Sequence, residues 1–275
     1  MVTYVQAIKG KKRDPGVIPL HGDEGFEGMR KAGNLTARAL DMLTDHVRPG
    51  VSTGELDRLA YEFGRDHNAI PATLFYRGFR HSICTSINHV VCHGIPGEKI
   101  LREGDIVNID LTLIYEGWHG DSSRMYAVGK ISTKAGRLIK ITYESLAKGI
   151  EAAIPGNTTG DIGAAIQQHA ESERTSIVRD FVGHGLGQLF HDEPNIMHFG
   201  TPGSGPELKP GMIFTIEPML NLGRPHVKVL NDGWTAVTRD RSLSAQCEHS
   251  IGITQTGNEI FTSSPASIFN PQSPH

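Results

Sequence analysis

The chain has 275 residues, of which 38% are hydrophobic and 21% charged, a composition that indicates a globular protein. Its formal net charge of −3 argues against a protein that attracts DNA or an anionic membrane through its overall field. No apolar run in the sequence approaches the ~20 residues of a membrane-spanning helix. The three cysteines, which form no CxxC pair, argue against a disulfide framework and favour a cytoplasmic location.

The first segment, residues 1–20, contains Gly and Pro together with the basic residues Lys9, Lys11, Lys12 and Arg13. This composition predicts a flexible, solvated N-terminal extension. The alternative for the basic run is docking to RNA or to a ribosome.

Helices and strands occur in two groups along the rest of the chain. Helical periodicity predicts helices over residues 24–47 and 52–66 in the first half, and over 134–153 and 159–173 in the second half. Strand patterns follow each helix pair, at residues 105–114 and 122–128, and at 212–221, 226–230, 234–237 and 247–254. Because helices precede strands in each half and no linker interrupts the chain, we predict one α+β domain.

The two halves share short sequence motifs. Residues 48–56, RPGVSTGEL, resemble residues 154–162, IPGNTTGDI, at an offset of 106 (154 against 48). Residues 101–110, LREGDIVNID, resemble residues 208–217, LKPGMIFTIE, at an offset of 107 (208 against 101). A nearly constant offset over two separate segments predicts two copies of one helix–helix–strand unit, related by a pseudo-two-fold axis.

The repeat makes two specific predictions. Each half should open a helix with a capping box, in which a hydroxyl is followed three residues later by an acid: Ser52 with Glu55, and Thr158 with Asp161. The alignment also superimposes Asp110 on Glu217. Equivalent strands are expected to meet at the axis, so the repeat predicts a cluster of carboxylates at the centre of the molecule.

Residues 104–126, GDIVNIDLTLIYEGWHGDSSRMY, carry two acids on a predicted hairpin. Asp110 lies within the first strand, Glu116-Gly117 signals a turn, and Asp121 follows the turn. Folding about this turn would place the two carboxylates opposite or diagonal to each other on one face. Buried like charges repel each other, so we predict a bound cation beside them.

Four acids lie in or beside apolar strands without a matching set of basic residues: Asp110, Asp121, Glu217 and Glu248. The alternative for each acid alone is a salt bridge. His184, in FVGHGLG, adds one nitrogen, and an oxygen-rich set with one nitrogen suits Mn²⁺, Fe²⁺, Co²⁺ or Zn²⁺. Four carboxylates balance the charge of two divalent ions better than that of one, so we predict a dinuclear site.

Two further histidines, His93 in VVCHGIPG and His191 in LFHDEPN, lie in similar turn-rich contexts. We predict that they hydrogen-bond the substrate or its oxyanion, and the alternative is that they are structural turn histidines. The remaining turn histidines considered are assigned to that structural class: His81, His89, His119 and His249.

Five motifs together resemble those of the bacterial type I methionine aminopeptidases: VVCHGIP, GDIVNIDLTLIYEGWHGDSSRMY, VGHGLGQLFHDEPNI, MIFTIEPML and SAQCEHSIGIT. They occur in that family's order and spacing, and the resemblance extends over residues 20–262. It implies the pita-bread α+β fold, in which helices cover an antiparallel sheet core with an internal pseudo-two-fold repeat. It also implies a single catalytic metallopeptidase domain over residues 21–265 and a C-terminal tail over residues 266–275.

The resemblance implies a role for each predicted ligand. Asp121 and Glu248 would bridge two divalent metal ions. Asp110 would chelate one ion, and His184 with Glu217 would bind the other.

The resemblance also implies catalytic and substrate-binding residues. Glu217 would carry protons, His191 would stabilise the oxyanion and His93 would contact the peptide nitrogen. The methionine pocket would consist of aromatic residues, a cysteine and one catalytic histidine: Tyr76, Phe79, Trp234, Cys84 and His93. Core packing is the alternative for the aromatic members and for Cys84. Asn108 and Ser244 match positions near a monovalent-cation site in some relatives.

The function implied is removal of the initiator Met from nascent polypeptides whose second residue is small, by a hydroxide activated at the dinuclear centre. The enzyme is expected to be a monomer, and contact with the ribosome is the further partner considered. One alternative is a Pro-specific aminopeptidase or dipeptidase of the same fold, and another is a non-catalytic binding homologue. A dinuclear phosphatase is disfavoured because no basic phosphate clamp accompanies the acids.

Overall fold

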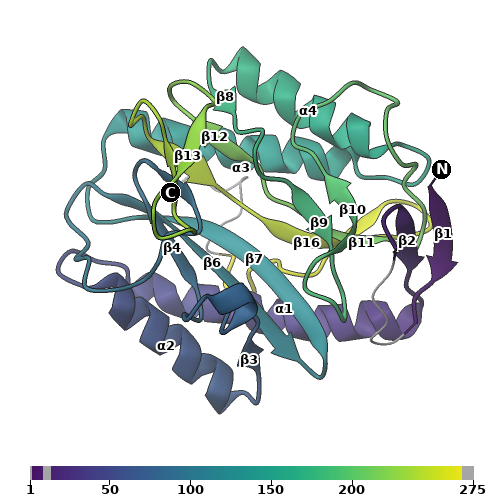
Figure 1. The fold of residues 1–275 in the computed structure, drawn as a ribbon, viewed down its shortest axis with the longest axis horizontal. Coiled ribbons are helices and arrows are strands. Elements are labelled where there is room, and N and C mark those ends of the chain that lie inside the picture. The colour runs from purple at the N-terminus through teal and green to yellow at the C-terminus, as the bar shows by residue number, and fades with distance from the viewer. Residues whose placement is uncertain (1, 9–13, 268–275) are drawn as a thin grey trace.

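A computed structural model describes residues 2–8 and 14–267 of the chain (Figure 1). The described residues form the helices α1 (Asp23–Leu43), α2 (Thr53–Asp66), α3 (Thr133–Ala152) and α4 (Thr159–Ser172). The strands of the first half are β1 (Thr3–Gln6), β2 (Val17–Leu20), β3 (Ile70–Pro71), β4 (Cys84–Ile87), β5 (Val90–Cys92), β6 (Ile106–Tyr115) and β7 (Trp118–Ala127). Those of the second half are β8 (Ser176–Ile177), β9 (Gly183–Gly185), β10 (Asp192–Ile196), β11 (Ile213–Ile216), β12 (Met219–Asn221), β13 (Val227–Val229), β14 (Ala236–Thr238), β15 (Ser244–Gln246), β16 (His249–Ile253) and β17 (Asn258–Ile260).

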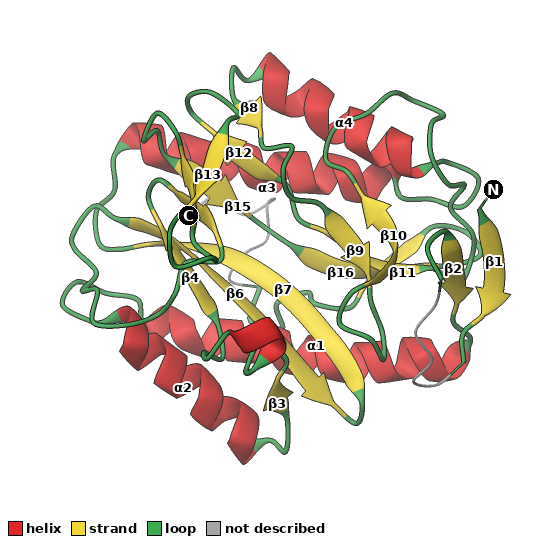
Figure 2. Ribbon diagram, in the orientation of Figure 1, coloured by secondary structure: helices red, strands yellow, loops and turns green. Residues whose placement is uncertain are grey.

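Helices cover the strands from two sides, which confirms the predicted α+β arrangement (Figure 2). α1 and α2 run along one side and α3 and α4 along the other, with the strands between them. α1 buries Met29, Ala32, Thr36, Leu40 and Leu43, and this spacing of three or four residues forms one continuous stripe. Because α1 packs on β6 and β7, the stripe covers the hairpin that carries the predicted acids.

The internal repeat is visible in the backbone contacts. Ser52 bridges to Ile100 in the first half, and Thr158 bridges to Glu207 in the second half, both in antiparallel fashion. The offsets are 106 (158 against 52) and 107 (207 against 100), the same values that relate the sequence motifs. Each bridge ties the start of the second helix of a half to the segment that precedes its acid-bearing strand.

The two predicted helix caps differ. Thr158 and Asp161 form the complete capping box, in which each side chain accepts the backbone N–H of the other residue. Ser52 accepts the N–H of Glu55, but the Glu55 carboxylate binds Arg58 instead of returning to Ser52. The prediction of a reciprocal box in the first half is therefore wrong, because a guanidinium one turn away competes for the carboxylate.

The β6–β7 hairpin places its two acids diagonally. In the antiparallel register, Thr112 pairs with Asp121 and Asp110 pairs with Ser123. The two aspartates thus lie on one face and two residues out of register, where long side chains reach each other. This confirms one of the two arrangements that the sequence predicts.

β7 is longer than predicted because the turn of the hairpin is tight. Glu116 and Gly117 have φ values of 50° and 83°, which is the positive-φ geometry of a two-residue hairpin turn. Pairing with β6 therefore begins at Trp118, where polar residues had masked the strand pattern up to residue 121.

The predicted strand over residues 212–221 is divided at Glu217 and Pro218 into β11 and β12. β11 lies between β9 and β16, whereas β12 lies between β8 and β15 in another sheet. Proline has no N–H to donate to a ladder, so the chain changes sheets at this point. The first predicted helix, over residues 24–47, also ends early, because Thr44–His46 forms a 3₁₀ turn.

Several short strands were not predicted, because two to five residues are too few to establish a period. Within the N-terminal segment, β1 pairs in parallel with β2. The basic run at residues 9–13 lies outside the described residues.

In the part of the chain that the structure describes, no helix combines the length and apolar character needed to cross a bilayer.

Candidate metal centre

The predicted site residues line one cavity of about 1110 Å³. The proposed metal ligands on its wall are Asp110, Asp121, His184, Glu217 and Glu248. The predicted catalytic and pocket residues on the same wall are His93, His191, Tyr76, Phe79, Cys84 and Trp234. Among the ligands, β6 and β7 carry those of the first half, whereas β9 carries His184, Glu217 directly follows β11 and Glu248 directly precedes β16. The cavity is therefore built jointly by the two halves.

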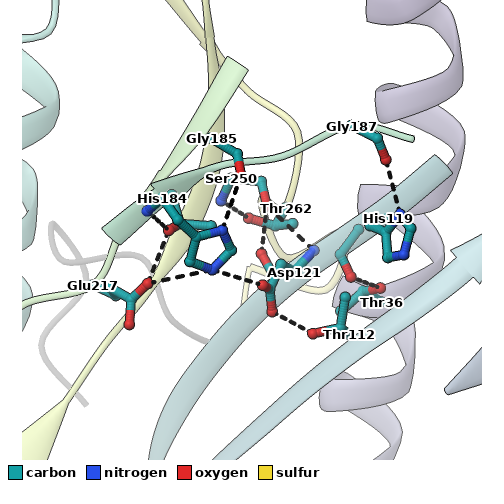
Figure 3. A network of polar contacts seen from close by, with 12 residues as sticks. Thr36, Thr112, His119, Asp121, His184, Gly185, Gly187, Glu217, Ser250 and Thr262 are labelled. Carbon is teal, nitrogen blue, oxygen red and sulfur yellow. Dashed lines mark hydrogen bonds and ion pairs between the residues drawn. The ribbon is translucent and has the colours of Figure 1, made fainter. Parts of the chain in front are cut away.

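Three side chains that line the cavity could hold one ion between them. One ligand atom of each of Asp121, His184 and Glu248 lies within 4.8 Å of the corresponding atoms of the other two. His184 Nε2 is 3.5 Å from Asp121 Oδ2 and 3.7 Å from Glu217 Oε1 (Figure 3). The imidazole thus lies between acids from both halves.

Asp121 is held by contacts to two neighbouring strands (Figure 3). Its Oδ1 accepts a hydrogen bond of 2.6 Å from Thr112 Oγ1 on the facing strand β6. Its backbone N–H donates to Ser250 Oγ, and this hydroxyl in turn donates to the Asp121 carbonyl. Since Oδ1 is engaged, Oδ2 is the oxygen that faces His184.

The tautomer of His184 follows from its hydrogen bond to the backbone. Its Nδ1 lies 3.1 Å from the carbonyl of Gly185, so Nδ1 carries the proton and Nε2 presents a lone pair to the acids. A Cβ on Gly185 would lie 2.0 Å from the Glu193 carbonyl, and one on Gly183 would lie 2.4 Å from the Thr215 carbonyl. Glycine on both sides of His184 is therefore required by close backbone approach.

Glu217 has three supporting contacts. Thr215 Oγ1 donates to its Oε1 at 2.8 Å, and Gln246 Nε2 donates to its Oε2 at 3.3 Å. The backbone N–H of Glu217 donates to His198 Nε2 at 3.1 Å. Thr215 Oγ1 also accepts the N–H of His184, so one hydroxyl connects both residues.

These supporting residues were not predicted from the sequence. Thr112 and Thr215 lie two positions from Asp110 and Glu217, so strand alternation places them on the same face as those acids and could have identified them. His198 and Gln246 carry no such signal, because their contacts with Glu217 depend on the packing of separate strands.

Burial of the four acids shifts their pKa values upward. Burial raises the pKa of Asp110 to about 7. It raises the pKa of Asp121 well above its usual value, and the charge of Asp110 adds to this effect. The pKa values of Glu217 and Glu248 are also raised, first by burial and then by the charge of Asp121. Four ionised acids are costly here unless cations balance them, so this oxygen-rich donor set fits divalent metal ions.

The nitrogen ligand is shifted in the opposite direction. Burial lowers the pKa of His184 to about 4, so its imidazole is neutral near pH 7. A neutral imidazole with a free Nε2 lone pair is the form that binds a metal. Burial likewise lowers the pKa of His191 to about 3.

Aromatic rings form one wall of the cavity. The rings of Phe79 and Trp234 meet edge to face at 5.1 Å, and the ring of Tyr76 stacks on His191 at 5.2 Å. His93 contacts Trp234 at 6.3 Å in an edge-to-face arrangement. The predicted pocket residues are therefore neighbours in space, and Cys92, Phe181 and Met219 also line the cavity.

Cys84 lies directly opposite Asp110 in the register of β4 and β6. Burial and the neighbouring carboxylates raise the pKa of its thiol well above the usual value. The thiol is therefore protonated near pH 7 and packs as a small apolar group.

Asn108 and Ser244, predicted near a monovalent cation, do not line the cavity. Asn108 Nδ2 donates to Ser123 Oγ and to the Gln246 carbonyl. Asn108 Oδ1 and Ser244 Oγ are both buried without a hydrogen-bond partner among the described residues.

The histidines assigned to a structural class have structural contacts. His119 Nδ1 is 2.9 Å from the Gly187 carbonyl, and His249 Nδ1 is 2.8 Å from Thr262 Oγ1. His81 Nδ1 is 3.0 Å from an oxygen of Asp57. His89 is the exception, because its side chain has no hydrogen bond or ring contact with the residues that the structure describes.

Comparisons with known proteins identify the family of this chain. The model of metallopeptidase family M24 matches residues 27–255. A methionine aminopeptidase of Rickettsia prowazekii is 55% identical over 256 residues, which cover 92% of this chain and 98% of that protein. The methionine aminopeptidase of Escherichia coli strain K12 is 49% identical over 247 residues, covering 89% of this chain and 94% of that protein.

Solved structures show the same fold. The crystal structure of the Rickettsia prowazekii methionine aminopeptidase matches with a TM-score of 0.89 at 56% identity and covers 89% of this chain and 99% of that chain. A prolidase of Pyrococcus furiosus matches with a TM-score of 0.69 at 21% identity, covering 88% of this chain and 65% of that chain, which shows a shared fold alone. The chain therefore belongs to metallopeptidase family M24 and, within it, to the methionine aminopeptidases.

Proposed function

We propose that the protein removes the initiator Met from nascent polypeptides whose second residue is small. The observation that carries this proposal is one cavity that joins a buried acid–imidazole cluster to an aromatic wall. The relatives at 49% and 55% identity, named methionine aminopeptidases, support it. The likeness to prolidases is one of fold, so it does not favour the Pro-specific alternative.

We propose that the site holds two divalent ions, chosen among Mn²⁺, Fe²⁺, Co²⁺ and Zn²⁺. Asp121 and Glu248 would lie between the ions, Asp110 would bind one, and His184 with Glu217 would bind the other. When bound, such ions lower the pKa of a water molecule and polarise the peptide carbonyl. Thr112 and the other hydrogen-bond donors around the acids would keep the ligand oxygens in place.

The histidines would act as neutral donors. Burial lowers the pKa values of His93 and His191, so each imidazole keeps one N–H near pH 7 without a positive charge. In this proposal, His191 donates to the oxyanion and His93 contacts the peptide nitrogen. In the same proposal, Glu217 takes a proton from the attacking water and passes it to the leaving amine.

Selection for Met would arise at the aromatic wall. Phe79 and Trp234 offer ring edges, and a thioether sulfur makes favourable contacts with aromatic rings at ~5 Å. The protonated thiol of Cys84 adds an apolar surface beside them. An unbranched, flexible side chain such as Met adapts to this irregular wall more readily than a β-branched one.

We further propose a cytoplasmic monomer that acts on N-termini as they leave the ribosome. The basic residues 9–13 are the candidate ribosome contact, and deleting residues 1–18 should weaken co-sedimentation with ribosomes. Unchanged co-sedimentation would remove this part of the proposal. We also propose a monovalent cation near Asn108 and Ser244, because each carries a buried oxygen without a hydrogen-bond partner among the described residues.

The decisive experiment measures free Met released from Met-Gly-Met-Met and free Pro released from Pro-Gly-Gly. Metal-stripped protein should release Met after addition of Mn²⁺ or Co²⁺ and should release no Pro. Glu217→Ala should abolish Met release, whereas Glu259→Gln, which alters a surface ion pair with Arg30, should not. Absence of Met release with every metal, in folded protein that still binds divalent ions, would contradict the proposal.

A further inference from the structure

Glu217 occupies an unusual place in the backbone. The ladder of β11 with β16 ends at Ile216, which pairs with His249, and the next ladder begins at Met219 in another sheet. Pro218 between them has no N–H. The N–H of Glu217 therefore lies at the change of sheets, where no strand supplies its acceptor.

An imidazole supplies that acceptor. His198 Nε2 receives the Glu217 N–H at 3.1 Å, and the side chain of His198 is 1% exposed. A ring nitrogen that accepts a hydrogen bond carries no proton, so the proton of this ring resides on Nδ1. His198 Nδ1 is buried without a hydrogen-bond partner among the described residues. An unsatisfied nitrogen on a buried imidazole lowers the stability of the fold, whereas an apolar side chain at this position would carry no such penalty.

The backbone around His198 is closely packed against α4. A Cβ on Gly163 of α4 would lie 2.4 Å from the Phe199 carbonyl and 2.8 Å from the Met197 carbonyl. These two carbonyls flank His198 on either side. The backbone on both sides of His198 is thus packed against a helix at a position where a side chain would not fit.

We infer that His198 is a positioning residue, which holds the Glu217 backbone at the change of sheets and thereby aims the Glu217 carboxylate into the cavity. The carboxylate is already oriented at its far end, where Thr215 and Gln246 donate to its two oxygens. With both ends held, the Glu217 side chain keeps its Oε1 within 3.7 Å of His184 Nε2. This inference rests on the proposed role of Glu217.

Three substitutions separate the hydrogen bond from the volume of the ring. His198→Gln keeps an acceptor oxygen at about the position of Nε2, His198→Asn is polar but too short to reach, and His198→Leu has no acceptor. Thr142→Val is the matched control, because it removes a buried hydrogen bond within α3 away from the cavity. All are measured in the full chain, with melting temperatures recorded for each.

The first readout is hydrogen–deuterium exchange at the Glu217 amide, which does not depend on activity. We expect faster exchange in His198→Leu and His198→Asn than in the wild type, and protection in His198→Gln. The second readout is kcat and KM for Met release, together with Mn²⁺ affinity. We expect a loss of ~10–100-fold in kcat or in Mn²⁺ affinity for the Leu and Asn variants, with partial rescue by Gln.

Equal Glu217 exchange in all variants would overturn the inference, as would a lower melting temperature with unchanged kcat and Mn²⁺ affinity in His198→Leu. If the wild type itself released no Met, the proposed function would fail. The exchange rates and the Mn²⁺ affinities would still decide whether His198 positions Glu217.

Discussion

The two halves of the molecule place their acids by different means. In the first half, Asp110 and Asp121 lie on one hairpin of two ten-residue strands, whose register is set by a single turn. In the second half, His184, Glu217 and Glu248 lie on or beside short strands of three to five residues. The repeat is therefore symmetric in its helices and asymmetric in its chemistry.

This difference has a physical consequence for support. A long antiparallel hairpin fixes its side chains through its own ladder, and the Asp121 carboxylate receives one side-chain hydrogen bond, from Thr112, while Ser250 bonds the Asp121 backbone. Short strands constrain their side chains less, so Glu217 is held by hydrogen bonds to Thr215, Gln246 and His198. We therefore expect the second half to be the more sensitive to changes outside the ligands themselves.

The largest expected effect comes from the two equivalent acids. Glu217→Gln should lower kcat for Met release by ~10²–10⁴-fold, because it removes both the proposed proton carrier and a ligand oxygen. Asp110→Asn should lower activity mainly through weaker metal binding, so excess Mn²⁺ should restore part of it. Steady-state kinetics over a metal titration would test this, and equal rescue of both variants would contradict a distinct role for Glu217.

The next effect concerns stability without metal. The pKa of Asp110 is raised from 3.8 to about 7, so the folded protein favours the protonated, neutral carboxyl. The stabilisation that this preference gives is complete below pH 3.8 and is lost as pH rises through about 7. At about 1.36 kcal/mol per pKa unit, this loss corresponds to roughly 4 kcal/mol.

In chelator, Asp110→Asn should therefore gain stability relative to the wild type as pH rises from 4 to 8, and adding metal to the wild type should remove this advantage. Denaturant unfolding at several pH values would measure the difference. A difference that does not change with pH would show that Asp110 is not the destabilising charge.

A smaller effect compares the supporting hydroxyls. Thr112→Val removes one donor to Asp121, whereas Thr215→Val removes the donor to Glu217 and the acceptor of the His184 N–H. Each variant should lose ~10–100-fold in activity, the usual effect of removing a hydrogen-bond partner of a metal ligand, and Thr215→Val should lose more than Thr112→Val. Kinetics and Mn²⁺ titration of the two variants would test the order, and the reverse order would contradict the asymmetry between halves.

The smallest effect concerns the helix caps. Thr158→Ala removes half of a complete capping box and should destabilise the protein by up to ~2 kcal/mol, whereas Ser52→Ala should cost only ~1 kcal/mol. Neither change should alter kcat. Thermal or urea unfolding would measure both, and equal losses would contradict the greater contribution expected from the Thr158 cap.

The sequence alone was sufficient for features that depend on local order. The helix periods and the turn at Glu116-Gly117 are read from neighbouring residues, and the repeat at offsets of 106 and 107 is read from matching short segments. The structure confirms each of them. The candidate ligands could also be predicted from the sequence, because an acid inside an apolar strand departs from the hydrophobic pattern of that strand.

Tertiary structure alone decided which atoms face each other. That Asp121 Oδ2 faces His184, that the chain changes sheets at Pro218 and that His198 accepts the Glu217 N–H all require strands far apart in sequence to pack together. Such contacts have no period and no fixed spacing along the chain, because they arise from the three-dimensional fit of separate elements. The residue types of the site were thus determined by the sequence, and its geometry by the packing of the two halves.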